Sequence, residues 1–400
     1  MKLNISVVIV NYKVPDYVHQ CILSLKKALN NYRYEIFVVD NNSMDESVEC
    51  IKKWHPDVRL IENNDNLGFS KANNIALKIA KGDFLLIINP DTFVPENLID
   101  DCMSFMKNHQ NAGAIGVKMF SAQGRYAPES KRGVPKPFTA FCKLIGLCGI
   151  FPKNKLFGRY YLGHIDNNKE ADIEILSGAC MFIRHKVLED VGLFDEDYFM
   201  YGEDIDLSYR ILKAGYKNCF IPTPIIHYKG ESTQKISYQY VNNFNKSMIV
   251  FFRKHFRFYS WVLEIPILLA VYLKAVFGFI KVGLYKFLGL RPSVQEVAGL
   301  KKFLVFSSVG EWKDPAVKIL KKYGYCTDVK MIDEKVMING HFALNDNGKE
   351  YDFIVYNTDD FTYKQIISFF TKNDKGGKVE LALYHPDVNK IITPIQVLNL

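Results

Sequence analysis

The run Ile5-Ser6-Val7-Val8-Ile9-Val10, which ends at the polar residue Asn11, decides the fold of this chain. A continuous apolar run of strand length is typical of a strand that is buried on both faces of a sheet. Similar runs follow at 35–39, 58–61 and 84–88, and segments with helical spacing at 16–27, 46–53 and 71–80 separate them. The alternation predicts an open α/β domain with a mostly parallel central sheet.

Polar residues stand where these predicted strands end. In an open α/β sheet, ligands bind beyond the carboxyl ends of the strands. The polar groups at these ends are Asn11, Asp40-Asn41-Asn42-Ser43, the segment 63–66 and Asn89-Pro90-Asp91. Their shared position predicts a binding site at one edge of the sheet.

Two of these groups allow more than one interpretation. Asp91 follows an apolar strand, so its carboxylate suits a hard divalent cation that holds substrate phosphates. An ordinary turn or helix-cap Asp is the alternative. Asp40 with Asn42 and Ser43 offers donors and acceptors for a base and a ribose, and an Asx turn is the alternative there.

An acidic cluster, Glu203-Asp204-Ile205-Asp206, follows the aromatic segment 198–201. Apolar residues with helical spacing come next, at 207–211. Carboxylates at a helix start can accept hydrogen bonds from free backbone N–H groups, and the helix dipole favours them there. Helix capping is therefore the simplest interpretation of this cluster taken alone.

The composition narrows the class of protein. The chain has 400 residues, 48% of them hydrophobic, and a net charge of +8. The length predicts two domains with a possible appendage. The basic residues form no stripe and no nucleic-acid motif, so a nucleic-acid partner is not expected. The first residues do not form a signal peptide. The eight cysteines are scattered, so neither a zinc site nor a disulfide framework is expected from them, and a cytoplasmic location is favoured.

Three segments are expected along the chain. Residues 1–250 form the α/β domain, with long loops and short helices at 121–170. Residues 251–298 are apolar and amphipathic, and the apolar part at 258–290 is too short for a clean membrane span. It suits contact with a membrane interface, with a helical hairpin packed on the protein as the alternative. Residues 299–400 form a small Rossmann-like α/β domain of unknown role, without the G-x-G-x-x-G fingerprint.

Taken together, residues 4–230 resemble a family 2 glycosyltransferase of the GT-A fold, in the rhamnosyltransferase-like branch. Several ordered motifs over more than half of the chain carry the resemblance, whereas each motif alone is weak. The matching segments are 6–12, 38–43, 66–74, 86–91, 178–181, 192–195 and 202–206.

The resemblance implies a donor site in the first half of the chain. Asp40 would meet the nucleotide base, and Asn11, Asn42 and Ser43 would line the nucleoside pocket. The floor under the diphosphate and sugar would be formed by Asn66, Gly68, Phe69 and Asn73. Lys131 and Arg132 would either contact the diphosphate or be solvated surface charges.

The resemblance also implies a metal. Asp91 stands where the family's D-x-D motif ends, but Asn89 replaces the first carboxylate. A Mg²⁺ or Mn²⁺ ion held by Asp91 would then depend partly on phosphate oxygens and on His227. A buried core or capping histidine is the alternative for His227.

Within the acidic cluster, Asp204 becomes the candidate base of an inverting transfer, because such a reaction needs a carboxylate to take the proton of the acceptor hydroxyl. Glu203 is the alternative base, with Asp204 then orienting the acceptor. Asp206 is expected to be structural or to bind the acceptor.

The implied function is transfer of a sugar from dTDP-rhamnose or a UDP-sugar to a glycan acceptor. A polyprenyl-linked acceptor at the inner face of the cell membrane is expected, with peripheral membrane contact and a role in cell-surface polysaccharide synthesis. The alternative is a non-catalytic GT-A-like protein that binds nucleotide-sugars. A nucleotidyltransferase is disfavoured because the N-terminal region lacks a Gly-rich phosphate loop.

Overall fold

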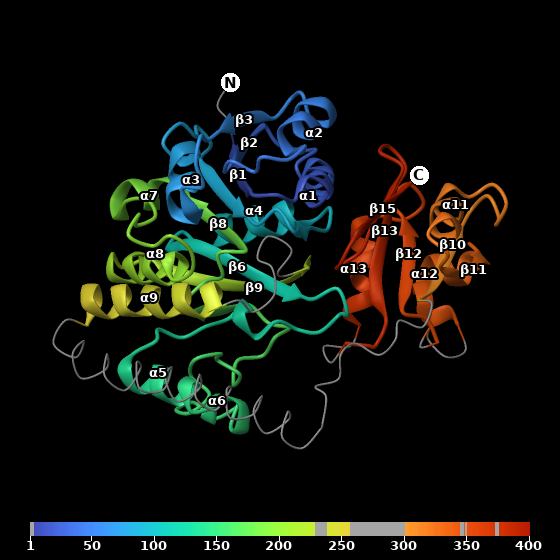
Figure 1. Cartoon of the computed structure of the whole chain (residues 1–400). Helices are drawn as coiled ribbons and strands as arrows, with labels where there is room; N and C mark the ends of the chain where they lie inside the picture. The colour runs from blue at the N-terminus through green and yellow to red at the C-terminus, as the bar shows by residue number, and fades with distance from the viewer. Residues whose placement is uncertain (1–3, 229–237, 257–300, 345–347, 349, 373–375) are drawn as a thin grey trace, which may run out of the picture.

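The computed structural model describes residues 4–228, 238–256, 301–344, 348, 350–372 and 376–400. Two α/β units lie side by side, the larger one N-terminal and the smaller one C-terminal (Figure 1). The whole segment expected to contact a membrane, 258–290, lies outside the described residues. Within them, no helix combines the length and the apolar character that a bilayer span requires.

The larger unit is built on a nine-stranded sheet in the described part of the chain. Its strand order is β3-β2-β1-β4-β8-β6-β9-β5, and β7 pairs with β9. Strands β1, β2, β3, β4, β6 and β9 run in one direction, and β5, β7 and β8 oppose them. The predicted α/β class with a mostly parallel sheet is confirmed. The strands are β1 (Ile5–Asn11), β2 (Tyr34–Asp40), β3 (Arg59–Glu62), β4 (Phe84–Ile88), β5 (Thr92–Phe93), β6 (Ala112–Phe120), β7 (Ala171–Ile173), β8 (Cys180–Arg184) and β9 (Lys217–His227).

Helices cover both faces of this sheet. Alternate residues of β1 enter two different apolar clusters: Val7 packs with residues of α1, and Val8 packs with residues of α3. This two-sided burial explains why the strand is apolar at nearly every position. The helices are α1 (Pro15–Ala28), α2 (Ser47–Trp54), α3 (Gly68–Leu77), α4 (Leu98–Asn108), α5 (Pro137–Leu144), α6 (Leu147–Ile150), α7 (His185–Val191), α8 (Glu203–Lys213) and α9 (Tyr238–His255).

The sheet register places the polar strand ends together. Asn11 at the end of β1 lies beside Asp40 at the end of β2, and Ile9 lies beside Ile88 at the end of β4. The short strand β5 then pairs with the end of β9, with Thr92 opposite His227. The polar residues that follow these strands therefore lie at one edge of the sheet.

The smaller unit has a six-stranded sheet of order β11-β10-β12-β13-β14-β15 among the described residues. The first four strands in this order are parallel, and β14 and β15 are antiparallel additions. Its elements are β10 (Lys302–Ser307), α11 (Pro315–Lys322), β11 (Cys326–Met331), α12 (Glu334–Asn339), β12 (Phe353–Asn357), α13 (Tyr363–Thr371), β13 (Glu380–His385), β14 (Lys390–Ile392) and β15 (Val397–Asn399).

The two units share one apolar cluster, which contains α1 residues such as Ile22 together with Tyr356 and Ile366. Polar contacts reinforce the junction. The Glu96 carboxylate accepts hydrogen bonds of 2.9 and 2.8 Å from the backbone N–H groups of Tyr363 and Lys364. Because these N–H groups belong to the first turn of α13, the larger unit satisfies donors that the helix itself leaves unbonded.

Candidate active site

A cavity of about 260 Å³ opens beside the start of α8. Its wall combines parts of the chain that are far apart in sequence. The residues that matter below are Phe69, Asn89, Arg132, Gly178, Glu203, Asp204 and His227. Thus the strand-end group at Asn89 and the acidic cluster of α8, both expected at the site, face one cavity.

The predicted nucleoside residues form a tight network at the ends of β1 and β2. Asp40 is buried, and its Oδ1 accepts hydrogen bonds from Asn11 Nδ2 at 2.7 Å and from Ser43 Oγ at 2.6 Å. Its Oδ2 accepts the backbone N–H of Ser43 at 3.0 Å. Asn42 holds a positive φ of 60° within this turn. The structure brings these residues together, and their contact with a base remains a prediction.

Asn41 holds the next group of residues that are predicted to bind the sugar donor. The sequence alone assigns Asn41 no role of its own. Asn41 Nδ2 donates to Asn66 Oδ1 at 2.8 Å, and Asn41 Oδ1 accepts the backbone N–H of Leu67 at 3.0 Å. Asn66 Oδ1 also accepts the N–H of Gly68 at 3.0 Å. A buried amide that bonds two loops fixes the approach of the chain to α3.

Gly68 allows a close approach that no other residue permits. Its φ is +79°, and a Cβ added there would lie 2.4 Å from the carbonyl oxygen of Phe199. Phe69 lines the cavity, and its N–H donates to the same oxygen at 2.7 Å. Asn73 holds the Phe69 carbonyl through its Nδ2 at 2.9 Å. Gly68 thereby lets the loop before α8 pack directly on the start of α3.

Asp91, Asn89 and His227 come together as the sequence predicts. His227 Nε2 lies 3.2 Å from Asp91 Oδ1 and 3.4 Å from Asn89 Nδ2. The pairing of β5 with β9 produces this proximity. Asn89 and His227 line the cavity, whereas the Asp91 side chain is 1% exposed and lies behind them. A carboxylate oxygen and an imidazole nitrogen at this separation fit two ligands of one divalent cation.

The first turn of α8 carries Glu203 and Asp204, and Gly202 before it has a φ of 87°. Because Gly202 has no side chain, it cannot cap the helix through a side-chain hydrogen bond. Asp204 Oδ1 instead accepts the N–H of Ile205 at 2.8 Å. Asp204 Oδ2 accepts the N–H of Gly178 at 3.0 Å and lies 2.5 Å from Arg132 Nη2. The acidic cluster is therefore more than a helix cap, because it meets a cation and a second loop at the cavity.

Arg132 is a site residue whose position the sequence did not fix. Its side chain is 11% exposed, and it also donates to the Leu176 carbonyl. Lys131 is fully buried and donates to the Ile165 carbonyl. The expectation of solvated surface charge is therefore wrong for both residues. Burial opposes the charge of Arg132, but Asp204 together with Tyr160 and Glu129 outweighs burial and raises the Arg132 pKa.

The two carboxylates of α8 have different environments. Burial, and then the neighbouring charge of Asp204, raises the pKa of Glu203 from 4.5 to about 8. Glu203 Oε2 has no hydrogen-bond partner among the described residues. Glu203 is thus mostly protonated at neutral pH, whereas Asp204 is paired with a guanidinium. Two carboxyl groups held in different protonation states can take different chemical roles.

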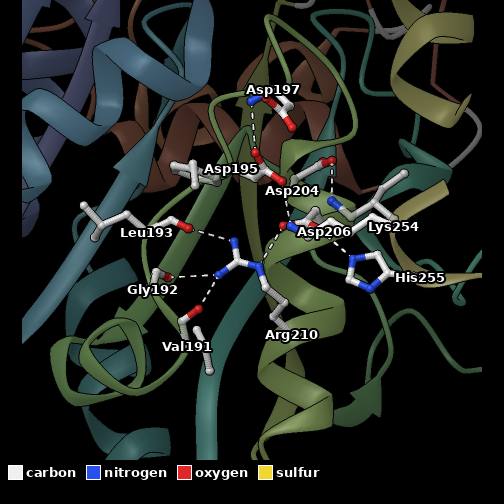
Figure 2. Close-up of polar contacts among 12 residues, drawn as sticks. Val191, Gly192, Leu193, Asp195, Asp197, Asp204, Asp206, Arg210, Lys254 and His255 are labelled. Carbon is white, nitrogen blue, oxygen red and sulfur yellow. Dashed lines mark hydrogen bonds and ion pairs between the residues drawn. The ribbon is translucent and has the colours of Figure 1, made fainter. Parts of the chain in front are cut away.

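Asp206 is surrounded by Arg210, Lys254 and His255, as Figure 2 shows. It is 0% exposed, and its Oδ2 accepts Arg210 Nε at 2.7 Å. Its Oδ1 lies 2.7 Å from His255 Nε2 and 2.8 Å from Lys254 Nζ. Since Asp206 does not line the cavity, its surroundings favour the structural alternative over acceptor binding.

Arg210 continues this network into the loop before α8. Its Nη1 and Nη2 donate to the carbonyls of Val191, Gly192 and Leu193 at 2.6, 3.1 and 2.7 Å (Figure 2). These carbonyls lie at the end of α7, where a helix leaves acceptors unbonded. Asp206 and Arg210 therefore join the end of α7 to α8, and Lys254 and His255 add α9.

Comparison with known proteins finds similarity to sugar-transferring enzymes. The model of "Glycosyl transferase family 2" matches residues 6–192, and that of "Glycosyl transferase family group 2" matches residues 157–309. The chain is 27% identical over 259 residues to the N-acetylglucosaminyl-diphospho-decaprenol L-rhamnosyltransferase of Mycobacterium tuberculosis, a match that covers 62% of this chain and 83% of that protein.

Two further proteins are similar. The low-salt glycan biosynthesis hexosyltransferase Agl10 of Haloferax volcanii is 26% identical over 263 residues, which cover 62% of this chain and 76% of that protein. Among solved structures, the mannosyltransferase PcManGT from Pyrobaculum calidifontis, in complex with GDP-Man and Mn²⁺, matches with a TM-score of 0.43 and 18% identity. That match covers 64% of this chain and 65% of the mannosyltransferase chain, just under two thirds of it.

The ionisation of Glu203 can be tested by stability. Between pH 4.5 and about 8, the unfolded chain binds fewer protons at Glu203 than the folded chain does, so the folded state loses stability as the pH rises through this window. Glu203→Gln keeps the shape and removes the charge. The Tm of Glu203→Gln minus the Tm of wild type should therefore be several degrees larger at about pH 8 than at pH 4.5. Glu46→Gln, at an exposed carboxyl, is the control, and an equal Tm difference at every pH for Glu203→Gln would contradict the assignment.

Proposed function

Because the chain belongs to glycosyl transferase family 2, in its rhamnosyltransferase-like branch, we propose that it moves a sugar from dTDP-rhamnose or a UDP-sugar to a hydroxyl of a glycan acceptor, with inversion. The acceptor is a lipid-linked glycan in cell-surface polysaccharide synthesis. The observation that carries the proposal is the cavity at which Asn89 and His227 meet Glu203 and Asp204.

Asp91 and His227 would hold a Mg²⁺ or Mn²⁺ ion. The fit rests on the 3.2 Å separation of Asp91 Oδ1 and His227 Nε2 and on their oxygen and nitrogen donors. The pair supplies two ligands, and oxygens of the donor diphosphate and water would supply the others. When bound, the ion would stabilise negative charge on the departing nucleoside diphosphate.

Asp204 is the proposed base, and its free acceptor position supports this role. A carboxylate has about four acceptor positions, and three of those on Asp204 are taken by Arg132, Gly178 and Ile205. The remaining position on Oδ1 suits an acceptor hydroxyl. Asp204 takes the hydroxyl proton as the acceptor oxygen bonds to the anomeric carbon and the bond from that carbon to the diphosphate oxygen breaks.

Glu203 is unsuited to be the general base at neutral pH, and this supports the choice of Asp204. With a pKa raised to about 8 by burial and by Asp204, it keeps its own proton at pH 7. A protonated carboxyl is a hydrogen-bond donor rather than a base. Glu203 therefore positions the acceptor or its neighbour Asp204, and Asp204 accepts the proton.

A surface beside the cavity suits a lipid-linked acceptor. Helices α5 and α6 and the loop after them expose Phe138, Phe141, Ile145, Ile150, Phe151 and Leu156, and we call this set the α5–α6 patch. Lys143, Tyr160 and Tyr161 of the same segment line the cavity. Exposed apolar side chains gathered on one segment are typical of interaction sites.

The charge around the α5–α6 patch favours an anionic membrane as its partner. Residues 131–165 contain lysines and arginines and no Asp or Glu. Basic residues attract anionic lipid headgroups while apolar side chains enter the interface. The α5–α6 patch would thus hold the cavity at the membrane surface on which a polyprenyl-linked glycan lies.

The role of Asp204 is tested by Asp204→Asn, which keeps the size of the side chain and removes the base. Transfer should fall by about 10²–10⁴-fold, the range of general-base contributions. The dissociation constant of the donor, measured by calorimetry with Mn²⁺ present, should change little. A variant that transfers like wild type would show that Asp204 is not the base.

Asp197→Asn, at an exposed carboxylate of the preceding loop, is the matched control and should keep full transfer. Glu203→Gln separates the two candidate bases, because it should retain more transfer than Asp204→Asn. Addition of EDTA should weaken donor binding by every variant if Asp91 and His227 hold a divalent ion. Donor binding by wild type without transfer to any hydroxyl would favour the non-catalytic alternative.

The membrane proposal predicts that the full chain floats with vesicles rich in phosphatidylglycerol. The triple variant Phe141→Ser, Ile145→Ser, Ile150→Ser should lose most of this binding, since each side chain is exposed and apolar. Val309→Ser, Ile338→Ser, Ile395→Ser removes equally exposed apolar side chains of the smaller unit and is the control. Equal flotation of both triple variants would exclude the α5–α6 patch as the membrane contact.

A further inference from the structure

A second cluster of metal-binding side chains lies at the junction of the two units, on residues that the proposed reaction does not use. His19 lies on α1, His385 ends β13, and Asp387 lies in the turn before β14. One potential ligand atom from each lies within 4.8 Å of the others. The three residues are the only group of this kind among the residues that the structure describes.

His385 offers a nitrogen with no other bond to make. The residue is 0% exposed, and its Nε2 lies 3.0 Å from Gln20 Oε1. An amide oxygen only accepts, so Nε2 carries the proton and Nδ1 keeps its lone pair. Within the described residues, Nδ1 has no hydrogen-bond partner.

His19 brings a second ring nitrogen to the cluster. Its Nε2 lies 2.9 Å from Asp387 Oδ2, so the imidazole and the carboxylate face each other. Its Nδ1 lies 3.0 Å from His55 Nε2. A histidine ligand commonly has its other ring nitrogen fixed by such a neighbour. Gln20 and His55 therefore fix the orientation of the two imidazoles through the ring nitrogens that do not face the cluster.

We propose that His19, His385 and Asp387 bind one Zn²⁺ ion that joins α1 of the larger unit to the β13–β14 turn of the smaller unit. Two imidazoles and one carboxylate are ligands that suit zinc better than magnesium or calcium. Asp387 is 48% exposed, so the site opens to solvent on its side, and water would complete a tetrahedral shell. The ion is separate from the one assigned to Asp91 and His227.

The proposed ion would stabilise the junction. His19 and Asp387 are far apart in sequence, so the site forms only in the folded chain. A ligand that binds only the folded chain raises its stability by mass action. The cluster has no sequence signature, because its three ligands come from two distant segments instead of a short motif. The described cysteines are all free and take no part.

The test uses the full chain, purified without a histidine tag. Elemental analysis should find about one zinc per chain. After removal of the metal by a chelator, zinc at about 100 times its dissociation constant should raise Tm by roughly 3 °C. Co²⁺ should bind in its place with the visible absorption of a tetrahedral site. A chain that binds no zinc stoichiometrically and shows no Tm rise would overturn the proposal.

Two ligand variants locate the site. His385→Gln and Asp387→Asn should each abolish the stoichiometric zinc and its Tm rise. Asp387 is half exposed, so Asp387→Asn tests the proposal even if a change at the buried His385 prevents folding. His341→Gln alters a buried histidine of the same unit that bonds Tyr356 and should keep the zinc. His227→Gln should also keep it, and retention of zinc by Asp387→Asn would overturn the assignment.

Discussion

A carboxylate removed from water must meet compensating charge, and Asp206 is the place where this fold depends on that requirement. It is 0% exposed and meets Arg210, Lys254 and His255. Burial alone would raise its pKa, but hydrogen bonds from His255 and Lys254 and the charge and hydrogen bond of Arg210 lower it to about 2. The stabilisation is therefore complete above the ordinary Asp pKa of 3.8 and is lost only as the pH falls toward 2.

This buried pairing governs the position of the candidate catalytic groups. Arg210, which binds Asp206, also donates to the carbonyls at the end of α7. Lys254, which binds Asp206 as well, lies with its Nζ 2.6 Å from Asp195 Oδ2. The first turn of α8 is held between these contacts, so Glu203 and Asp204 reach the cavity from a rigid element. Arg132 and Gly178 then orient Asp204 from the opposite wall.

Much of the fold and part of the site could be predicted from the sequence, because the signals are local. The buried strand at 5–10 and the polar residues after each strand come from periodicity and position, and His227 follows from the resemblance. The roles of Arg132 and Asn41 could not be predicted, since each depends on contacts with residues distant in sequence. The same holds for the orientation of Asp206 toward α9. The histidine cluster at the junction depends on how the two units pack, which no short motif records.

If Asp204 takes the proton of the attacking hydroxyl, the acceptor displaces the diphosphate directly at the anomeric carbon. The configuration of the first-formed product tests this most directly. Proton NMR of the product, recorded before any anomeric equilibration, should show the configuration opposite to that of the sugar in the nucleotide donor. A product that retains the donor's configuration would contradict the role given to Asp204 and to the cavity around it.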